Sequence, residues 1–205
     1  MIGSVGNRLR LVLRQPETIA PAPAPEPEVP EVEFVAYAED GRLSGSIRLD
    51  AGRLSDMLNG HDEYLLVDVR AERIPGGEPT IVPEILVRRE ELLLVHATGP
   101  RGERERRLRT IPRAVSIQTG PFLVTGDLHA SAGLDTIIYF RRRRPMVPLT
   151  DACIQYSTAA GPVTEYVDAI VVNRDLITWV QVGEAGAVAR DQLDIAMPNL
   201  GNRTA

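Results

Sequence analysis

The sequence lacks lysine, so all 23 of its basic side chains are arginines, and it contains a single cysteine, Cys153. One thiol excludes an intrachain disulfide and favours a reducing, cytoplasmic compartment. Arginine used without lysine is typical of a GC-rich genome and favours a bacterial source. It also means that every permanently positive side chain carries a planar guanidinium group, whose geometry suits hydrogen bonding to carboxylates and phosphates.

Aromatic residues and long apolar runs are also scarce. Aromatics make up 4% of the chain, so a core must be built mainly from Val, Leu, Ile and Ala. No apolar run approaches the roughly 20 residues that a membrane-spanning helix needs. The N-terminus has no apolar segment followed by an Ala-x-Ala site, as a signal peptide would. The net charge of -5 argues against the whole chain being a nucleic-acid binder.

The motifs of common catalytic and metal sites are missing as well. The histidines His61, His96 and His129 are far apart, and there is no His-Glu-x-x-His or Cys-x-x-Cys. There is no Gly-x-Gly-x-x-Gly, phosphate loop or Gly-x-Ser-x-Gly either. We therefore expect no metal, no cofactor and no enzyme activity, and we interpret Cys153 as a buried structural thiol.

Composition divides the chain into six segments. Residues 1–14 are amphipathic, and form either a frayed terminus or a helix that docks on a partner or a membrane surface. Residues 15–31 alternate proline with alanine and glutamate, which is typical of an extended linker. Two strand-rich units follow at 32–98 and 114–182, with an arginine-rich bridge at 99–113 between them. Residues 183–205 are predicted to be a flexible tail.

The second unit repeats landmarks of the first in the same order. Leu43-Ser44-Gly45 corresponds to Val124-Thr125-Gly126, and Ile85 to Glu90 corresponds to Ile170 to Asp175. Asp68 and Asp151 also occupy matched positions, between apolar or small neighbours. These matches predict an internal duplication, in which the two aspartates serve the fold through a turn or a backbone hydrogen bond.

Each unit is predicted to contain two strands, a short helix and three further strands. Gly45 lies inside the second strand, a position typical of a bulge. Because few residues separate the strands, we expect the sheets to be mostly antiparallel. The predicted fold class is therefore mainly β, with two tandem copies of a small five-stranded antiparallel roll or open barrel, each with one short helix.

A short helix with the pattern Arg-Leu-Ser-Asp-x-Leu-Asn, at residues 53–59, precedes a strand that carries Asp68. Over residues 34–95 this order resembles a group of uncharacterised bacterial tandem β domains, from which no activity can be carried over. The second unit lacks the Leu-Asn ending. The five-strand count and the closing Ile170 to Asp175 are also similar to Sm-like β rolls, although here the helix lies within the strand order.

Two loops at matched positions carry opposite charge. Arg141, Arg142, Arg143 and Arg144 form a basic loop that aligns with residues 60–63, where His61, Asp62 and Glu63 form an acidic one. Residues 32–98 hold 13 acidic residues against 7 arginines, whereas the bridge holds six arginines against two glutamates. This divergence predicts association between the copies, within a chain or between chains.

These observations favour a non-catalytic scaffold or protein-interaction module that self-associates, or binds another protein, through its complementary charged loops. The alternative is a module that binds a phosphate ligand or a nucleic acid through Arg141 to Arg144 and the bridge residues Arg104, Arg106 and Arg107. An enzyme with an unfamiliar site between the units is a third hypothesis, which a pocket lined by titratable groups with shifted pKa values would favour. Membrane contact is expected only through residues 1–14.

Overall fold

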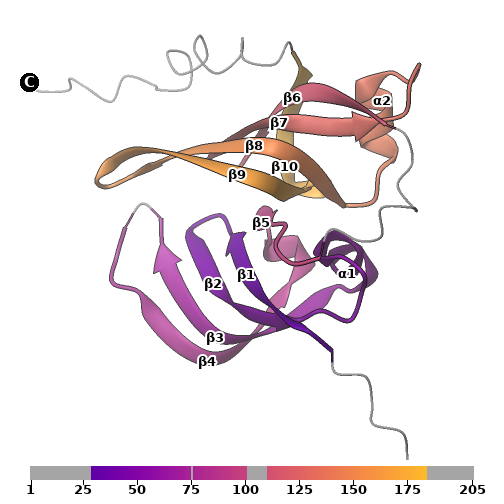
Figure 1. The fold of residues 1–205 in the computed structure, drawn as a ribbon. Helices are drawn as coiled ribbons and strands as arrows, with labels where there is room; N and C mark the ends of the chain where they lie inside the picture. The colour runs from indigo at the N-terminus through magenta and orange to yellow at the C-terminus, as the bar shows by residue number, and fades with distance from the viewer. Residues whose placement is uncertain (1–28, 75, 101–109, 184–205) are drawn as a thin grey trace, which may run out of the picture.

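The computed structural model describes residues 29–74, 76–100 and 110–183 (Figure 1). The predicted N-terminal segment, most of the linker, the bridge arginines Arg104, Arg106 and Arg107, and nearly all of the predicted tail lie outside the described residues. Within the described ranges, no helix is both long enough and apolar enough to cross a membrane.

The described chain is mainly β, and its elements occur in the same order in both halves. The first half contains β1 (Glu31–Tyr37), β2 (Gly41–Arg48), α1 (Leu54–Gly60), β3 (Glu63–Arg73), β4 (Thr80–Arg88), the 3-10 helix η1 (Arg89–Glu91) and β5 (Leu94–His96). The second half contains β6 (Ile111–Thr119), β7 (Phe122–Ala130), α2 (Thr136–Arg142), β8 (Met146–Thr158), β9 (Gly161–Asn173), η3 (Arg174–Leu176) and β10 (Ile177–Val182).

All ten strands belong to one antiparallel sheet, in the order β10-β6-β7-β8-β9-β5-β1-β2-β3-β4. The sequence predicts a separate sheet for each unit. The structure differs because β5 pairs with β1 on one edge and with β9 on the other, and so joins the two groups of strands. In Figure 1 the halves form two curved layers with β5 between them.

Each half bends at the glycine of its second strand. The pairing register shifts between Ser44 and Ser46 in the first half, and between Thr125 and Asp127 in the second. On the neighbouring strands, Asp68 and Asp151 have φ values of 51 and 49, in the left-handed region that aspartate tolerates better than most residues. The predicted bulge at Gly45 is confirmed. The turn or backbone hydrogen bond predicted for the two aspartates stays a prediction, and the structure adds that both have the same left-handed backbone conformation.

Two clusters of buried apolar side chains form the core, and each takes residues from both halves. Met146 and Val171 of the second half pack in the cluster around Leu58 and α1. Tyr37 and Leu94 of the first half pack in the other cluster. Because the halves exchange core side chains, neither has a core built only from its own residues.

The predicted bridge at 99–113 is too long at its C-terminal end. β6 begins at Ile111, and its first residues pair with the end of β7, Pro112 with His129 and Arg113 with Leu128. Pairing with a neighbouring strand overrides the polar character of this segment, which was the basis of the predicted boundary.

Replacing Gly45 with alanine should destabilise the fold, because the added Cβ would lie 2.7 Å from the carbonyl oxygen of Val67. Overpacking of this kind lowers the free energy of unfolding by roughly 1–3 kcal/mol. Gly52→Ala is the matched control, since nothing lies within 4 Å of its added Cβ. It should change the free energy by less than about 0.5 kcal/mol. Urea denaturation measures both, and equal stabilities would contradict the close approach at Gly45.

Candidate interaction surfaces

The acidic loop, His61 to Glu63, connects α1 to β3 and is held in place by the protein beneath it. The Tyr64 hydroxyl donates to the Leu58 carbonyl at 2.7 Å and lies 2.9 Å from the His61 carbonyl. Burial raises the pKa of Tyr64 to about 12, so the hydroxyl remains a donor at neutral pH. Arg89 lies 2.6 Å from the Asp62 carboxylate, whose side chain is still 81% exposed. The backbone is therefore fixed while the carboxylates face solvent.

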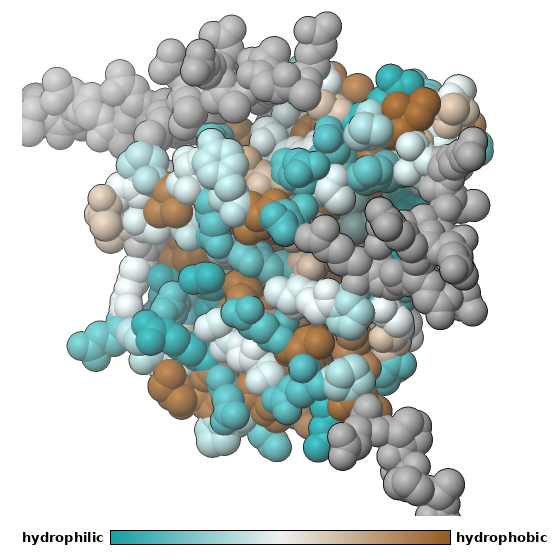
Figure 2. Space-filling view, viewed as in Figure 1, coloured by the Kyte–Doolittle hydropathy of each residue, from teal (hydrophilic) through white to brown (hydrophobic). Residues whose placement is uncertain are grey.

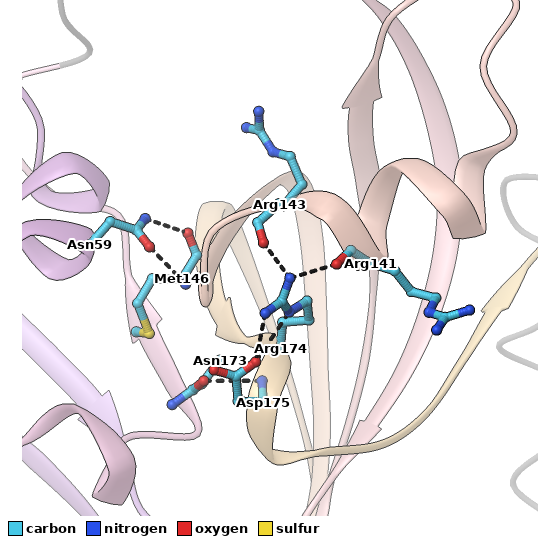
Figure 3. Close-up of polar contacts among 7 residues, drawn as sticks. All are labelled: Asn59, Arg141, Arg143, Met146, Asn173, Arg174 and Asp175. Carbon is cyan, nitrogen blue, oxygen red and sulfur yellow. Dashed lines mark hydrogen bonds and ion pairs between the residues drawn. The ribbon is translucent and has the colours of Figure 1, made fainter.

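The basic loop, Arg141 to Arg144, spans the end of α2 and the residues before β8. Arg174 of η3 donates to the Arg141 carbonyl at 2.7 Å and to the Arg143 carbonyl (Figure 3). The Arg143 guanidinium lies 5.2 Å from the centroid of the Tyr139 ring. The other three arginines of the loop are exposed. This loop also has a fixed backbone and charged side chains that face solvent.

The two loops occupy equivalent places in the two halves. His61 directly follows α1, and Arg143 directly follows α2. Arg89 of η1 donates to the His61 carbonyl at 3.3 Å, and Arg174 of η3 donates to the Arg143 carbonyl. The structure therefore aligns His61 with Arg143, one residue further along than the sequence alignment. The opposite charge of the two loops is unchanged by this shift.

The structure does not join these loops to each other by ion pairs. Among the described residues, Asp62 pairs with Arg89, and Glu63 lies 3.6 Å from Arg88, while no ion pair links either acid to the basic loop. In Figure 3 the Arg141 guanidinium points away from α1. The predicted contact between oppositely charged copies is thus not made by these side chains inside the described chain.

Neutral polar side chains make the contact between the halves beside the β5–β9 pairing. The Asn59 amide donates to the Met146 carbonyl at 2.8 Å and accepts from the Met146 N–H at 3.0 Å (Figure 3). The Asn173 side chain donates to the Arg89 carbonyl at 3.0 Å. From the sequence Asn59 is only the last residue of the short helix pattern at residues 53–59, and no local signal indicates that it meets a strand so far along the chain.

A group of aromatic and charged side chains forms a second contact between the halves. The Tyr37 hydroxyl donates to the Glu165 carboxylate at 2.7 Å, across 128 residues of sequence. The His96 Nε2 lies 3.7 Å from the same carboxylate. The Tyr37 ring packs against the rings of Phe122 and Tyr156, with centroids 5.2 and 5.9 Å apart. Sequence reasoning did not find this group, because its members come from five strands.

Burial is the largest influence on the acid–base groups of this contact. It raises the pKa of Tyr37 far above its usual value, and the hydrogen bond to Glu165 acts in the same direction. Burial lowers the pKa of His96, although the Glu165 carboxylate opposes that shift. A phenol, an imidazole and a carboxylate are groups that acid–base catalysts use. Here, however, Tyr37 is 0% exposed and its hydroxyl is bonded to Glu165, so the group holds the halves together.

A groove of about 450 Å³ lies beside α1 and β3 in the first half. Its lining includes His61 and Glu63 of the acidic loop, the acidic residues Glu31, Asp50 and Glu84, one arginine, Arg48, and apolar residues such as Leu65. Apolar patches among hydrophilic side chains are visible on this half in Figure 2. The groove therefore extends the acidic loop and suits a basic segment with an apolar side.

The single thiol and the histidines add no further site. Cys153 is buried, as the sequence predicts, and burial raises the pKa of its thiol. Within residues 29–74, 76–100 and 110–183, no three His, Cys, Asp or Glu side chains are grouped so that they could hold a metal ion.

No protein-family model, curated protein or solved structure matches this chain.

Replacing Asn59 with alanine should weaken the contact between the halves, because the Met146 N–H and carbonyl both lose their partner. Leaving buried backbone groups unpaired costs roughly 1–3 kcal/mol of unfolding free energy. Ser55→Ala on the same helix is the control and should change stability by less than about 0.5 kcal/mol. Urea denaturation compares the two, and an Asn59 variant as stable as the control would contradict this role.

The depressed pKa of His96 predicts that acid weakens the fold. Below about pH 6.5 the unfolded chain binds a proton at His96 that the folded chain excludes, so this contribution is complete above that pH and is lost as the pH falls. His96→Phe should reduce the loss of stability between neutral and mildly acidic pH, whereas His129→Gln should not. Urea midpoints across this range give the comparison. Equal losses in the parent and in His96→Phe would show that His96 is not responsible.

Proposed function

We propose that this protein is a non-catalytic scaffold module built from two copies of one β unit, which associates with other protein chains through the oppositely charged loops of the copies. The observation that carries the proposal is the placement of these loops. Asp62 and Glu63 follow one helix, Arg141 to Arg144 span the end of the equivalent helix and the residues after it, and most of the charged groups face solvent on a fixed backbone.

The matched register of the two halves supports the duplication. Phe34 lies opposite Gly45 in the first half, as Val115 lies opposite Gly126 in the second. In the same way, Tyr64 pairs with Val87, as Val147 pairs with Val172. A shared order of elements arises easily by chance, but a shared register with a bulge at the same place does not, since a slip of one residue turns every side chain to the other face.

The charge divergence supports association with another chain. Two copies of one unit can keep the same backbone and carry opposite charge at one loop. The acidic loop then attracts the basic loop, while two loops of the same charge repel each other. Inside the described chain no printed ion pair joins one loop to the other. Asp62 remains largely exposed although it pairs with Arg89, and Arg141, Arg142 and Arg144 are exposed as well, which supports a role in binding a partner. The buried group around Tyr37 is used in holding the halves together, which fits a structural role.

The alternative function uses the basic loop together with the bridge arginines, which lie outside the described residues. Arg141, Arg142 and Arg144 are exposed and lie within four consecutive residues, and clusters of arginine can bind phosphate groups. Binding to a nucleic acid would weaken steeply as salt rises, because each contact releases condensed counterions.

Light scattering on the full chain at low and high salt tests the proposal. Salt at about 1 M shortens the range of charge attraction to about 3 Å, so we expect a multimer at low salt whose mass falls as salt is added. The combined variant Arg141→Glu, Arg142→Glu and Arg144→Glu should have a lower mass already at low salt.

The control carries the same change in charge at other exposed or half-exposed positions, Arg53→Glu, Arg73→Glu and Arg113→Glu, and should keep the parent mass. A parent chain that is monomeric at every salt concentration contradicts the proposal. If that monomer binds an oligonucleotide with a steep salt dependence, and the triple loop variant does not, the alternative function replaces it.

A further inference from the structure

The sheet has two ends, β4 and β10, and each of these strands has one neighbouring strand among the described residues. Their counterparts in the other half are inside the sheet. The counterpart of β4 is β9, because each is the fourth strand of its half. The counterpart of β10 is β5, because each is the fifth strand of its half. β9 and β5 pair with each other, so the chain already contains one joint of the kind that its two ends lack.

The positions at this joint can be transferred to the ends residue by residue. At the joint, Leu94 lies opposite Val172 and Val95 lies opposite Val171. Ala36 and Ile117 occupy equivalent positions in β1 and β6. Because Ala36 pairs with Val95 and Ile117 pairs with Val180, Val180 is the counterpart of Val95, and Trp179 is the counterpart of Leu94. Val87 pairs with Tyr64 on β3, and Val172 pairs with the equivalent residue Val147 on β8. Leu86 and Val87 are therefore the counterparts of Val171 and Val172.

We infer that β10 of one chain pairs antiparallel with β4 of a second copy of this chain, with Val180 opposite Leu86 and Trp179 opposite Val87. This inference rests on the proposed function, and it names the partner and the register. The same head-to-tail contact repeated from chain to chain produces a closed ring, or a filament where the rotation does not close.

The side chains at the two ends suit such a joint. Leu94, Val95, Val171 and Val172 are all 0% exposed at the internal joint. Their counterparts at the ends are also apolar, yet Leu86 is 59% exposed and Trp179 is 36% exposed. Pairing of the ends would remove this apolar surface from water, as the internal joint does for its own residues.

The backbone at both ends can form the required hydrogen bonds. At the internal joint, Asn173 donates its N–H to the Leu93 carbonyl and Ala97 donates to the Ala169 carbonyl. Their counterparts, Arg88 and Val182, both have an N–H. Pro83 lacks one, but residues alternate in direction along a strand, so the outward donors of β4 belong to residues 84, 86 and 88.

The charged loops meet at the same joint. Beside β5 and β9, Asn59 at the end of α1 contacts Met146 at the start of β8. The counterpart of Asn59 is Arg141 at the end of α2, and the counterpart of Met146 is Glu63 at the start of β3. A neutral contact inside the chain thus becomes a contact between opposite charges at the ends. The groove beside β3 includes both Glu63 and Glu84, and therefore lies where the basic loop of the next chain would approach.

Disulfide trapping between two chains tests the register. Both chains carry Cys153→Ala, one also carries Leu86→Cys, and the other carries Val180→Cys. After the two are mixed and oxidised, we expect a dimer whose linked peptides, identified by mass spectrometry, contain residues 86 and 180. Gln181→Cys in place of Val180→Cys is the matched control, and should give roughly tenfold less product because neighbouring residues of a strand point to opposite faces.

A charge exchange checks the same joint without cysteines. Arg141→Glu or Glu63→Arg alone should lower the mass of the assembly at low salt, and the two together should restore it. Restoration and the 86–180 disulfide support the inference. A multimer that gives no 86–180 disulfide, or that links residue 86 to residue 86, overturns this register and leaves the proposed function in place. A parent chain that stays monomeric overturns both.

Discussion

Strand β5 is only three residues long, and it is hydrogen-bonded to β1 on one edge and to β9 on the other. Its side chains alternate between the two cores, since Leu94 packs in the cluster around Phe122 and Val95 packs in the cluster around Leu58. One short strand therefore completes the first group of strands and joins it to the second. Without this double pairing the sheet would divide in two, and both clusters would lose residues.

The internal joint and the two ends of the sheet differ in charge more than in shape. Inside the chain, Asn59 satisfies the backbone of Met146, and no charge is placed in the contact. At the ends, the corresponding positions are Arg141 and Glu63. In the proposed assembly an acidic end would attract a basic end, while two ends of the same kind would repel each other, so charge would favour head-to-tail contact over pairing of like strands.

Local features of this fold could be predicted from the sequence, because they depend on a few neighbouring residues. The bulge at Gly45 and the order of strands and helices follow from glycine positions, apolar alternation and turn residues. The pairing of β5 with β9 could not be predicted in this way, since its partners lie far apart in the chain and any apolar strand fits such a pattern. The hydrogen bond from Tyr37 to Glu165 spans 128 residues and leaves no local signal. The charged loops could be found because both are short and unbroken in sequence, whereas their alignment in the structure differs from the sequence alignment by one residue.

Hydrogen exchange of the full chain at low and high protein concentration tests most directly whether the joint made by β5 recurs between chains. We expect the amides of β5 to be protected at every concentration, and those of Leu86, Arg88 and Val182 to become protected only as the concentration rises. If the amides of β4 and β10 exchange at the same rate at all concentrations while the protein is multimeric, the chains associate through another surface and the joint does not recur between them.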